Sequence, residues 1–393
     1  MRPAATDMDT RALAPASTLT APQRQVAELL ARADIGIDGA RPWDMRLYDP
    51  AVLDDALARG NLGLGEGYVA GCWDCGQLDA FFDRLLLAHL EREVRSPRLA
   101  WHALRAKLLN RQNRRHAWDV GRAHYDLGND FFATMLDPRM AYSCGYWRDA
   151  GTLAEAQEAK LELVCRKLGL SPGMRVLDIG CGWGSFMGYA AEKHGVRCIG
   201  VTVSAEQAAF ARERYPRLPL EFRLQDYREL SPGTLGGAVD RVVSIGMFEH
   251  VGHRNHREFM RVVRRCLADD GLALLHTIGK RRRDTAIDPW IDKYVFPNGD
   301  LPSIGQIGDA IDDELVAEDV HNFGADYDRT LMAWDANFEA AWPRFAQRHG
   351  EAFHRQWRYY LLSCAGAFRA RDLQLWQWVL SKDGVRGGYR RPE

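Results

Sequence analysis

The chain lacks an excess of charge of either sign, a long apolar run and a regular spacing of cysteines. Its 393 residues include 52 Lys and Arg against 53 Asp and Glu, which gives a formal net charge of -1. This balance does not indicate a dedicated nucleic-acid binder. No apolar run is long enough to cross a bilayer, and none follows the first residues as it does in a secretory signal. We therefore expect a cytoplasmic protein that binds no nucleic acid.

The eight cysteines are scattered rather than spaced as a disulfide framework, and a cytoplasmic chain of this length does not need one. Cys72 and Cys75 have the spacing of a zinc knuckle or a redox pair, but no second pair of ligands follows nearby. We expect two packed thiols beside Trp73, and we expect no metal.

Composition and periodicity divide the chain into three predicted parts. Residues 1–22 are rich in Ala, Thr, Pro and Asp without periodicity, which predicts a mobile tail. Residues 23–115 are predicted to form a mostly helical N-terminal domain, with helices beginning near Gln25 and at 78–90 and a glycine-rich break at 60–65. Residues 116–393 are predicted to form a second, larger domain.

A basic segment covers residues 95–122, where Arg and Lys are opposed almost solely by Asp119. Within it Trp101, Leu104 and Leu108 recur at helical spacing. One interpretation is a solvated connecting helix. The other is an interfacial segment, in which Arg and Lys meet anionic lipid headgroups while Trp and Leu face the acyl chains. The residues alone leave both interpretations open.

Short apolar segments alternate with helical ones after residue 170. The predicted strands are 174–179, 197–203, 220–224, 241–245 and 272–277, the predicted helices include 205–214 and 258–267, and the apolar runs 315–320 and 373–380 are candidates to complete the sheet. Such alternation predicts an α/β fold, a Rossmann-like parallel sheet with helices on both faces.

The strongest single motif is DIGCGWGS at residues 178–185, between a predicted strand and a predicted helix. Gly180, Gly182 and Gly184 let the backbone approach a nucleotide ligand closely. Two details favour S-adenosylmethionine over a dinucleotide. Asp178 precedes the loop, where it can face a cationic amino-acid group. The spacing GxGxG also differs from GxGxxG, so no helix terminus is offered to a pyrophosphate.

The second predicted strand lacks the carboxylate that ordinarily holds the ribose hydroxyls at its tip. We expect Thr202 and Gln207 to make polar contacts in its place. Gln225 and Asp226, after the third predicted strand, are expected beside the adenine.

Several further segments together resemble the cyclopropane fatty acid synthase family, which is related to the mycolic acid methyltransferases. They are YDLGND at 125–130, YSCGYW at 142–147, MFEHVG at 247–252, HTIG at 276–279, DPWI at 288–291, NFGADY at 322–327 and CAGAFRARD at 364–372. The likeness runs from about residue 122 almost to the C-terminus. It extends more weakly into the N-terminal part, as in members that act on membrane phospholipids.

The resemblance implies a methyltransferase domain that transfers the methyl of S-adenosylmethionine to the cis double bond of an unsaturated phospholipid acyl chain and closes a cyclopropane ring. It implies cofactor contacts at Tyr142 and Ser143 in addition to the loop. It also implies a homodimer with a lipid-associated N-terminal domain, peripheral at the inner membrane face. Finally, it implies a bicarbonate ion surrounded by Cys144, Glu249, His276, Ile278 and Tyr327, with Cys144 and Ile278 contributing through their backbone.

The chemistry agrees with this set of residues. An isolated alkene is a poor nucleophile with no proton to remove before attack, so positioning in a dry site must supply most of the acceleration. Methyl transfer leaves a carbocation, and ring closure then needs a base. Glu249 and His276 stand at the carboxyl ends of neighbouring predicted strands, where the ligand crevice of such sheets lies. Each residue also has an interpretation without catalysis. Glu249 could be a carboxylate at a helix N-terminus, and His276 could be a core histidine with its hydrogen bonds satisfied.

Cys364 is a further candidate because it lies in a family-like segment. A thiolate beside a sulfonium methyl would itself be methylated, so a buried structural thiol is the better expectation. Two alternative functions stay open: a lipid methyltransferase that forms a methyl branch or methylene group, and a non-catalytic protein that binds cofactor or lipid. The joint presence of Glu249, His276 and Tyr327 favours catalysis and the cyclopropane product.

Overall fold

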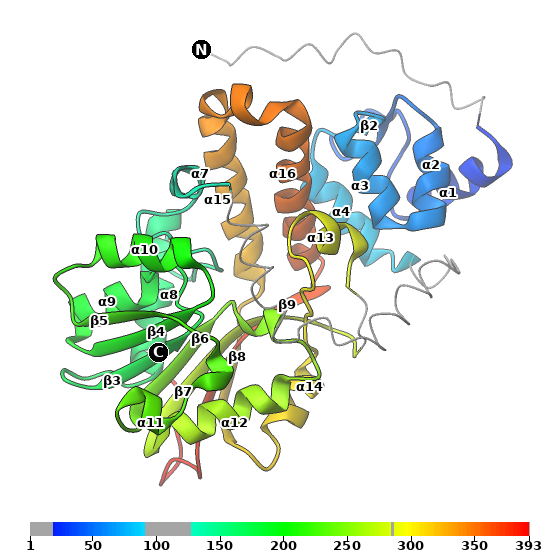
Figure 1. The fold of residues 1–393 in the computed structure, drawn as a ribbon. Coiled ribbons are helices and arrows are strands. Elements are labelled where there is room, and N and C mark those ends of the chain that lie inside the picture. The colour runs from blue at the N-terminus through cyan, green and yellow to red at the C-terminus, as the bar shows by residue number, and fades with distance from the viewer. Residues whose placement is uncertain (1–18, 91–126, 284–286, 393) are drawn as a thin grey trace.

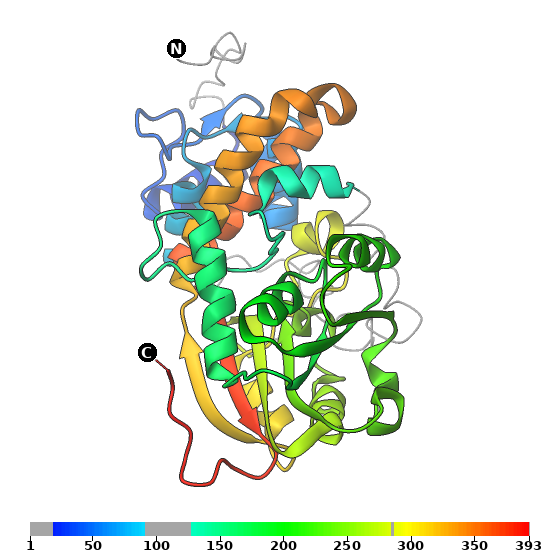
Figure 2. The same cartoon turned by 90° about the vertical axis from the view of Figure 1, so that its left-hand side faces the viewer.

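The structure is a computed structural model that describes residues 19–90, 127–283 and 287–392. It has two parts: a sheet flanked by helices, and a helical part that includes the helices of the N-terminal region (Figures 1 and 2). The predicted basic segment 95–122 and most of the predicted tail lie outside the described residues. No helix within the described ranges is long and apolar enough to span a membrane.

The sheet contains seven strands in the described residues, in the order β5-β4-β3-β6-β7-β9-β8. The strands are β3 (Arg175–Ile179), β4 (Arg197–Thr202), β5 (Leu220–Leu224), β6 (Val239–Ile245), β7 (Leu267–Lys280), β8 (Val316–Asn322) and β9 (Leu373–Ser381). Strands β3 to β7 are parallel, whereas β9 runs antiparallel to both of its neighbours, β7 and β8. The predicted α/β sheet is confirmed, and both late apolar runs complete it.

Alternating side chains of the strands supply two separate hydrophobic layers. Helices α8 (Leu153–Lys167), α9 (Ser185–His194) and α10 (Ala205–Arg214) cover one face, and α11 (Pro232–Leu235), α12 (His256–Cys266) and α14 (Ile304–Ile311) cover the other. Val243 of β6 packs in the first layer, and its neighbour Val242 packs in the second. Coverage on both faces explains why the strands read as nearly continuous apolar runs.

The helical part is built from both ends of the chain. Its elements are α1 (Ala21–Arg32), β1 (Arg46–Leu47), α2 (Ala51–Arg59), α3 (Asn61–Val69), β2 (Trp73–Asp74), α4 (Leu78–Leu87), α7 (Asn129–Met135), α13 (Pro289–Tyr294), α15 (Ala325–Ala341) and α16 (Ala346–Arg369). One hydrophobic cluster joins the N-terminal helices to α7, α15 and α16. Arg355 of α16 strengthens this junction by donating to the carbonyls of Tyr68 at 2.6 Å and Trp73 at 2.9 Å.

The glycine-rich stretch at residues 60–65 is a break only at Gly60, whose φ is 60°. The rest of it forms the first half of α3, so the prediction of a longer interruption was wrong. Gly63 and Gly65, inside the helix, allow close packing against neighbouring segments rather than a turn. A Cβ placed on Gly65 would lie 2.4 Å from Cδ1 of Trp290, a fully buried side chain of α13.

Gly65→Ala is therefore expected to lower the free energy of unfolding by about 1–3 kcal/mol, because the added methyl group overlaps the Trp290 ring. Gly308→Ala in α14 is the matched control, since a Cβ there meets nothing within 4 Å. It should raise the free energy of unfolding by about 0.5–1 kcal/mol, as alanine favours a helix. Urea unfolding followed by circular dichroism measures both variants, and equal stability of the two would contradict this packing.

Candidate functional site

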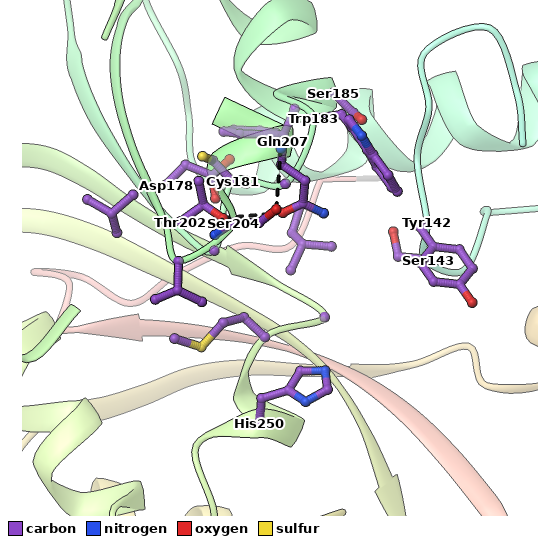
Figure 3. Close-up of a pocket in the computed structure, with 18 of the residues that line it drawn as sticks. Tyr142, Ser143, Asp178, Cys181, Trp183, Ser185, Thr202, Ser204, Gln207 and His250 are labelled. Atoms are coloured by element: carbon purple, nitrogen blue, oxygen red, sulfur yellow. Dashed lines mark hydrogen bonds between the residues drawn. The ribbon is translucent and has the colours of Figure 1, made fainter. Parts of the chain in front are cut away.

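A pocket of about 210 Å³ lies at the carboxyl ends of β3, β4 and β6. Figure 3 shows Asp178, Thr202 and Gln207 on one side of it and Tyr142 and Ser143 facing them. Its lining includes nine of the ten residues predicted to bind the cofactor: Tyr142, Ser143, Asp178, Gly180, Gly182, Thr202, Gln207, Gln225 and Asp226. The pocket therefore occupies the position that the sequence predicted for the nucleotide.

The glycine loop turns between β3 and α9 through backbone conformations that favour glycine. Gly180 has a φ of 90°, and a Cβ there would lie 2.6 Å from Cβ of Met247. Gly184, the tenth predicted residue, has a φ of 80° directly before α9 and does not line the pocket. A side chain on Gly184 would meet the Phe222 ring at 2.9 Å. The missing side chain at Gly180 thus leaves room for Met247 in the pocket wall, whereas the missing side chain at Gly184 lets α9 pack against β5.

The polar residues after the second and third parallel strands are held by local hydrogen bonds. The Thr202 hydroxyl donates to Oε1 of Gln207 at 3.2 Å, and the Asp226 carboxylate accepts from Nε and Nη2 of Arg228 at 2.9 and 2.8 Å. Thr202 stands where other nucleotide folds place a carboxylate. An amide and a hydroxyl offer donors and acceptors to a ribose without adding a charge.

Tyr142 and Ser143 are positioned by helices that pack behind them. The Tyr142 hydroxyl is 2.9 Å from the Tyr360 hydroxyl of α16. Two side chains of α8 hold Ser143: Gln157 Nε2 donates to its carbonyl at 2.7 Å and Lys160 Nζ donates to its hydroxyl oxygen at 3.0 Å. Helix α8 begins where it does because Thr152 and a glutamate three residues later form a capping box.

A second cluster lies next to the pocket and contains the predicted acid–base residues. Glu249 sits in a short helical turn, Phe248–His250, after β6, and its Oε1 accepts the backbone N–H of Ile278 at 2.6 Å. Its Oε2 is buried and has no hydrogen-bond partner among the described residues. Burial raises the pKa of Glu249 to about 7. A carboxyl group with this pKa exchanges a proton near neutral pH.

His276 lies on β7, on the same strand face as Ile278 because side chains alternate along a strand. Gln377 of β9 donates from Nε2 to Nδ1 of His276 at 3.2 Å. The neutral ring therefore carries its hydrogen on Nε2, which is buried and has no partner within the described part of the chain. Burial lowers the pKa of His276 well below its ordinary value, so the ring is a neutral donor rather than a cation.

Tyr327 of α15 completes the cluster. Burial raises the pKa of its hydroxyl well above the ordinary value, and the neighbouring groups that add to this effect include Cys144, Glu249 and Cys364. Burial likewise raises the pKa of the Cys144 thiol well above its usual range and that of Cys364 to about 12. Both thiols stay protonated at neutral pH, which agrees with the expectation that neither is a nucleophile.

Two chain segments connect the pocket to this cluster. Tyr142 and Ser143 line the pocket and Cys144 follows them, while Glu249 belongs to the cluster and His250 lines the pocket. Residues that line the pocket are therefore directly followed or preceded in the chain by Cys144 and Glu249 of the cluster. Such an arrangement suits a group transfer followed by a proton transfer.

Lys160, His250 and Gln377 are among the residues of this region that were not predicted from the sequence. Lys160 and His250 line the pocket, and Gln377 orients His276. A signal existed for Lys160, because it occupies a position on the apolar face of α8 that an aliphatic residue would normally fill. Gln377 gave no signal, since its partner lies 101 residues away in the sequence.

Comparison with known proteins matches this chain to one family. The family model described as Mycolic acid cyclopropane synthetase matches residues 112–378. Over 366 residues the chain is 52% identical to the cyclopropane-fatty-acyl-phospholipid synthase of Escherichia coli (strain K12), which covers 92% of this chain and 94% of that protein. That match reaches the N-terminal helices, which precede the residues of the family model.

Two solved structures resemble the catalytic part. The cyclopropane synthase MmaA2 from Mycobacterium tuberculosis is 33% identical with a TM-score of 0.63, over 67% of this chain and 98% of that chain. Mycolic acid cyclopropane synthase CmaA1, complexed with SAH and CTAB, is 35% identical with a TM-score of 0.61, again over 67% and 98% of the two chains.

Proposed function

This chain belongs to the mycolic acid cyclopropane synthetase family, and we propose that it converts cis double bonds of phospholipid acyl chains into cyclopropane rings with S-adenosylmethionine as the methyl donor. The observation that carries the proposal is the buried pair of Glu249 and His276, each with an unpartnered polar atom, beside a pocket lined by the predicted cofactor residues. Identity to the E. coli phospholipid enzyme over 92% of this chain supports a phospholipid substrate. SAH in the CmaA1 structure supports the methyl donor.

The residues of the chain perform three tasks in this reaction. The pocket holds the sulfonium cofactor and exposes its methyl group to the double bond, so that positioning lowers the barrier. Buried aromatic rings of this region, such as Tyr327 and Phe323, exclude water, and aromatic rings can stabilise a carbocation. Glu249 and His276 then hold and orient the base that removes a proton from the transferred methyl to close the ring.

Bicarbonate fits the cluster as we propose it. Protonated Glu249, the Nε2–H of His276 and the Tyr327 hydroxyl offer donors to an oxyanion, and two of these atoms have no partner in the described residues. The Lys160 ammonium lies close enough to lower the pKa of His276, so the local potential favours an anion. When bound, bicarbonate would supply the base for ring closure. The N–H of Ile278 meets Glu249 instead, so a bound anion would share or displace that contact.

A direct assay tests the function. Vesicles of a phospholipid with one cis-unsaturated acyl chain are incubated with the purified protein and S-adenosylmethionine. The lipid is expected to gain one CH2 by mass spectrometry and to lose its alkene signal by NMR. Gain of mass with a methyl branch or a methylene group would keep the cofactor assignment and refute ring closure. No change in any unsaturated lipid would refute the proposal.

We further propose that the enzyme acts at the inner membrane face as a homodimer and reaches anionic lipid through the basic segment 95–122. Replacing Arg111, Arg114 and Arg115 together by Ala should weaken binding to anionic vesicles by roughly tenfold or more, since each surface cation contributes about 1 kcal/mol. The difference should shrink as salt is raised, and neutral vesicles serve as the control in co-sedimentation. Equal binding by both proteins would mean that this segment is a solvated connector. The proposed homodimer is tested separately by analytical ultracentrifugation.

A further inference from the structure

We propose that Lys160 is a cofactor-recognition residue, which together with Ser143 binds the carboxylate of the methionine part of S-adenosylmethionine. Nothing in the sequence motifs or in the resemblance assigns a role to this lysine. The inference deepens the proposed function, because it rests on S-adenosylmethionine as the ligand of the pocket.

The geometry places the Lys160 ammonium at the pocket wall. Lys160 is 1% exposed and lines the pocket in the middle of α8. Its Nζ donates to the Ser143 hydroxyl oxygen at 3.0 Å. A hydroxyl that accepts from an ammonium must direct its own hydrogen elsewhere. Since Ser143 lines the pocket as well, its O–H is available as a donor to a ligand beside the Lys160 ammonium.

The charge of Lys160 is only partly compensated within the protein, because Asp137 and Asp178 lie close enough to raise its pKa but burial still lowers it to about 8. Over the ranges that the structure describes, its ammonium forms no ion pair with a carboxylate, and it donates a hydrogen bond to the neutral hydroxyl of Ser143. A buried cation without a counter-ion is costly, so such a group normally has an anionic partner. A carboxylate on the ligand would complete this site, and S-adenosylmethionine carries one carboxylate.

Asp178 provides the complementary half of the recognition. It lies on β3, lines the same pocket and is close enough to Lys160 for the two charges to influence each other. Burial raises the pKa of Asp178 to about 7, and a ligand ammonium group beside it would favour the ionised carboxylate. The two side chains would then match a zwitterion, with the ligand amino group toward Asp178 and its carboxylate toward Lys160. This arrangement selects the complete amino-acid end of the cofactor rather than its nucleoside alone.

Isothermal titration of the full-length protein with two ligands tests the proposal without lipid or turnover. The ligands are S-adenosylhomocysteine and its decarboxylated analogue, which keeps the amino group. Lys160→Met should weaken binding of S-adenosylhomocysteine by roughly 10- to 100-fold, the range of a hydrogen-bonded charge contact. Its affinity for the decarboxylated analogue should change less than about threefold, so the analogue also reports that the pocket is folded.

Lys167→Met is the matched control. Lys167 is another buried lysine of α8, but its ammonium is 3.1 Å from Nδ1 of His321 and 3.8 Å from Asp319, and it does not line the pocket. This variant should bind both ligands as the parent protein does. Equal loss for both ligands in Lys160→Met, or no loss for either, would overturn the proposal.

If Lys160→Met does not fold, Ser143→Ala gives the same comparison, because it removes the hydroxyl alone. Its loss of affinity should again be confined to the ligand with the carboxylate, and a uniform loss would overturn the proposal. The outcome is separable from the proposed reaction. A parent protein that binds S-adenosylhomocysteine in this selective way but leaves vesicle lipids unchanged would refute cyclopropanation and not carboxylate recognition.

Discussion

Glu249→Gln is expected to lower the rate of cyclopropane formation by about 10²- to 10⁴-fold, the usual contribution of an acid–base group. The substitution keeps the size of the side chain and the acceptor for the N–H of Ile278, a contact of 2.6 Å. It removes the ionisable group whose second oxygen is buried without a partner in the described residues. S-adenosylhomocysteine should bind within about threefold of the parent affinity, because Glu249 does not line the pocket.

Stability provides the control for this variant. The pKa of Glu249 is raised to about 7 by burial, so the folded protein holds a proton that the unfolded chain releases from about pH 4.5 upward. The unfolded chain is stabilised by this release, so the free energy of unfolding falls as the pH rises from about 5 to 7, by about 3 kcal/mol at most. Glu249→Gln should be at least as stable as the parent at pH 8. Full activity in Glu249→Gln, or unfolding of the variant, would contradict the assigned role.

His276→Asn is expected to lower cyclopropane formation by about 10²-fold or more, since the site loses a preorganised donor. An asparagine side chain reaches only the position of Nδ1, where it can still accept from Gln377. The inward Nε2–H disappears. His276→Gln reaches the position of Nε2 with an amide N–H and should retain more of the rate than His276→Asn.

Initial rates on vesicle lipid measure this pair of variants, with S-adenosylhomocysteine affinity as the reference for an intact pocket. Gln377→Leu should cause a smaller loss, because it frees the orientation of the ring and leaves Nε2–H in place. Equal rates in His276→Asn and His276→Gln would mean that the inward donor has no function, and His276 would then be a core residue.

Regular features of the sequence predicted most of the fold. Strands β3 to β7 lie at the predicted apolar runs, and helices α10 and α12 lie at segments with helical periodicity. The apolar runs mark the strands because helices cover both faces of the sheet and bury the side chains on each. The two late apolar runs were recognised as candidates for the sheet. The antiparallel pairing of β9 was not predicted, since an apolar run does not indicate whether its strand runs parallel or antiparallel to its neighbours.

The errors and omissions have physical causes. Glycines at residues 60–65 are ordinary breakers in isolation, and only the neighbouring Trp290 explains why α3 needs them. Nine of the ten residues proposed to bind the cofactor line the pocket, and they could be picked out because loops at strand ends carry local motifs. Gln377 could not be predicted, because it acts through a contact with a residue on another strand. The place of Lys160 on the apolar face of α8 was a signal, but its partner Ser143 lies outside that helix and could not be read from the sequence.

The most direct test of ring closure uses S-adenosylmethionine with a fully deuterated methyl group and vesicles of a cis-unsaturated phospholipid. Closure by loss of a proton from the transferred methyl predicts that the product retains two of the three deuterons, located in a cyclopropane methylene by NMR. Glu249→Gln should form almost none of this product under the same conditions. A product that keeps all three deuterons on a methyl branch would contradict the account.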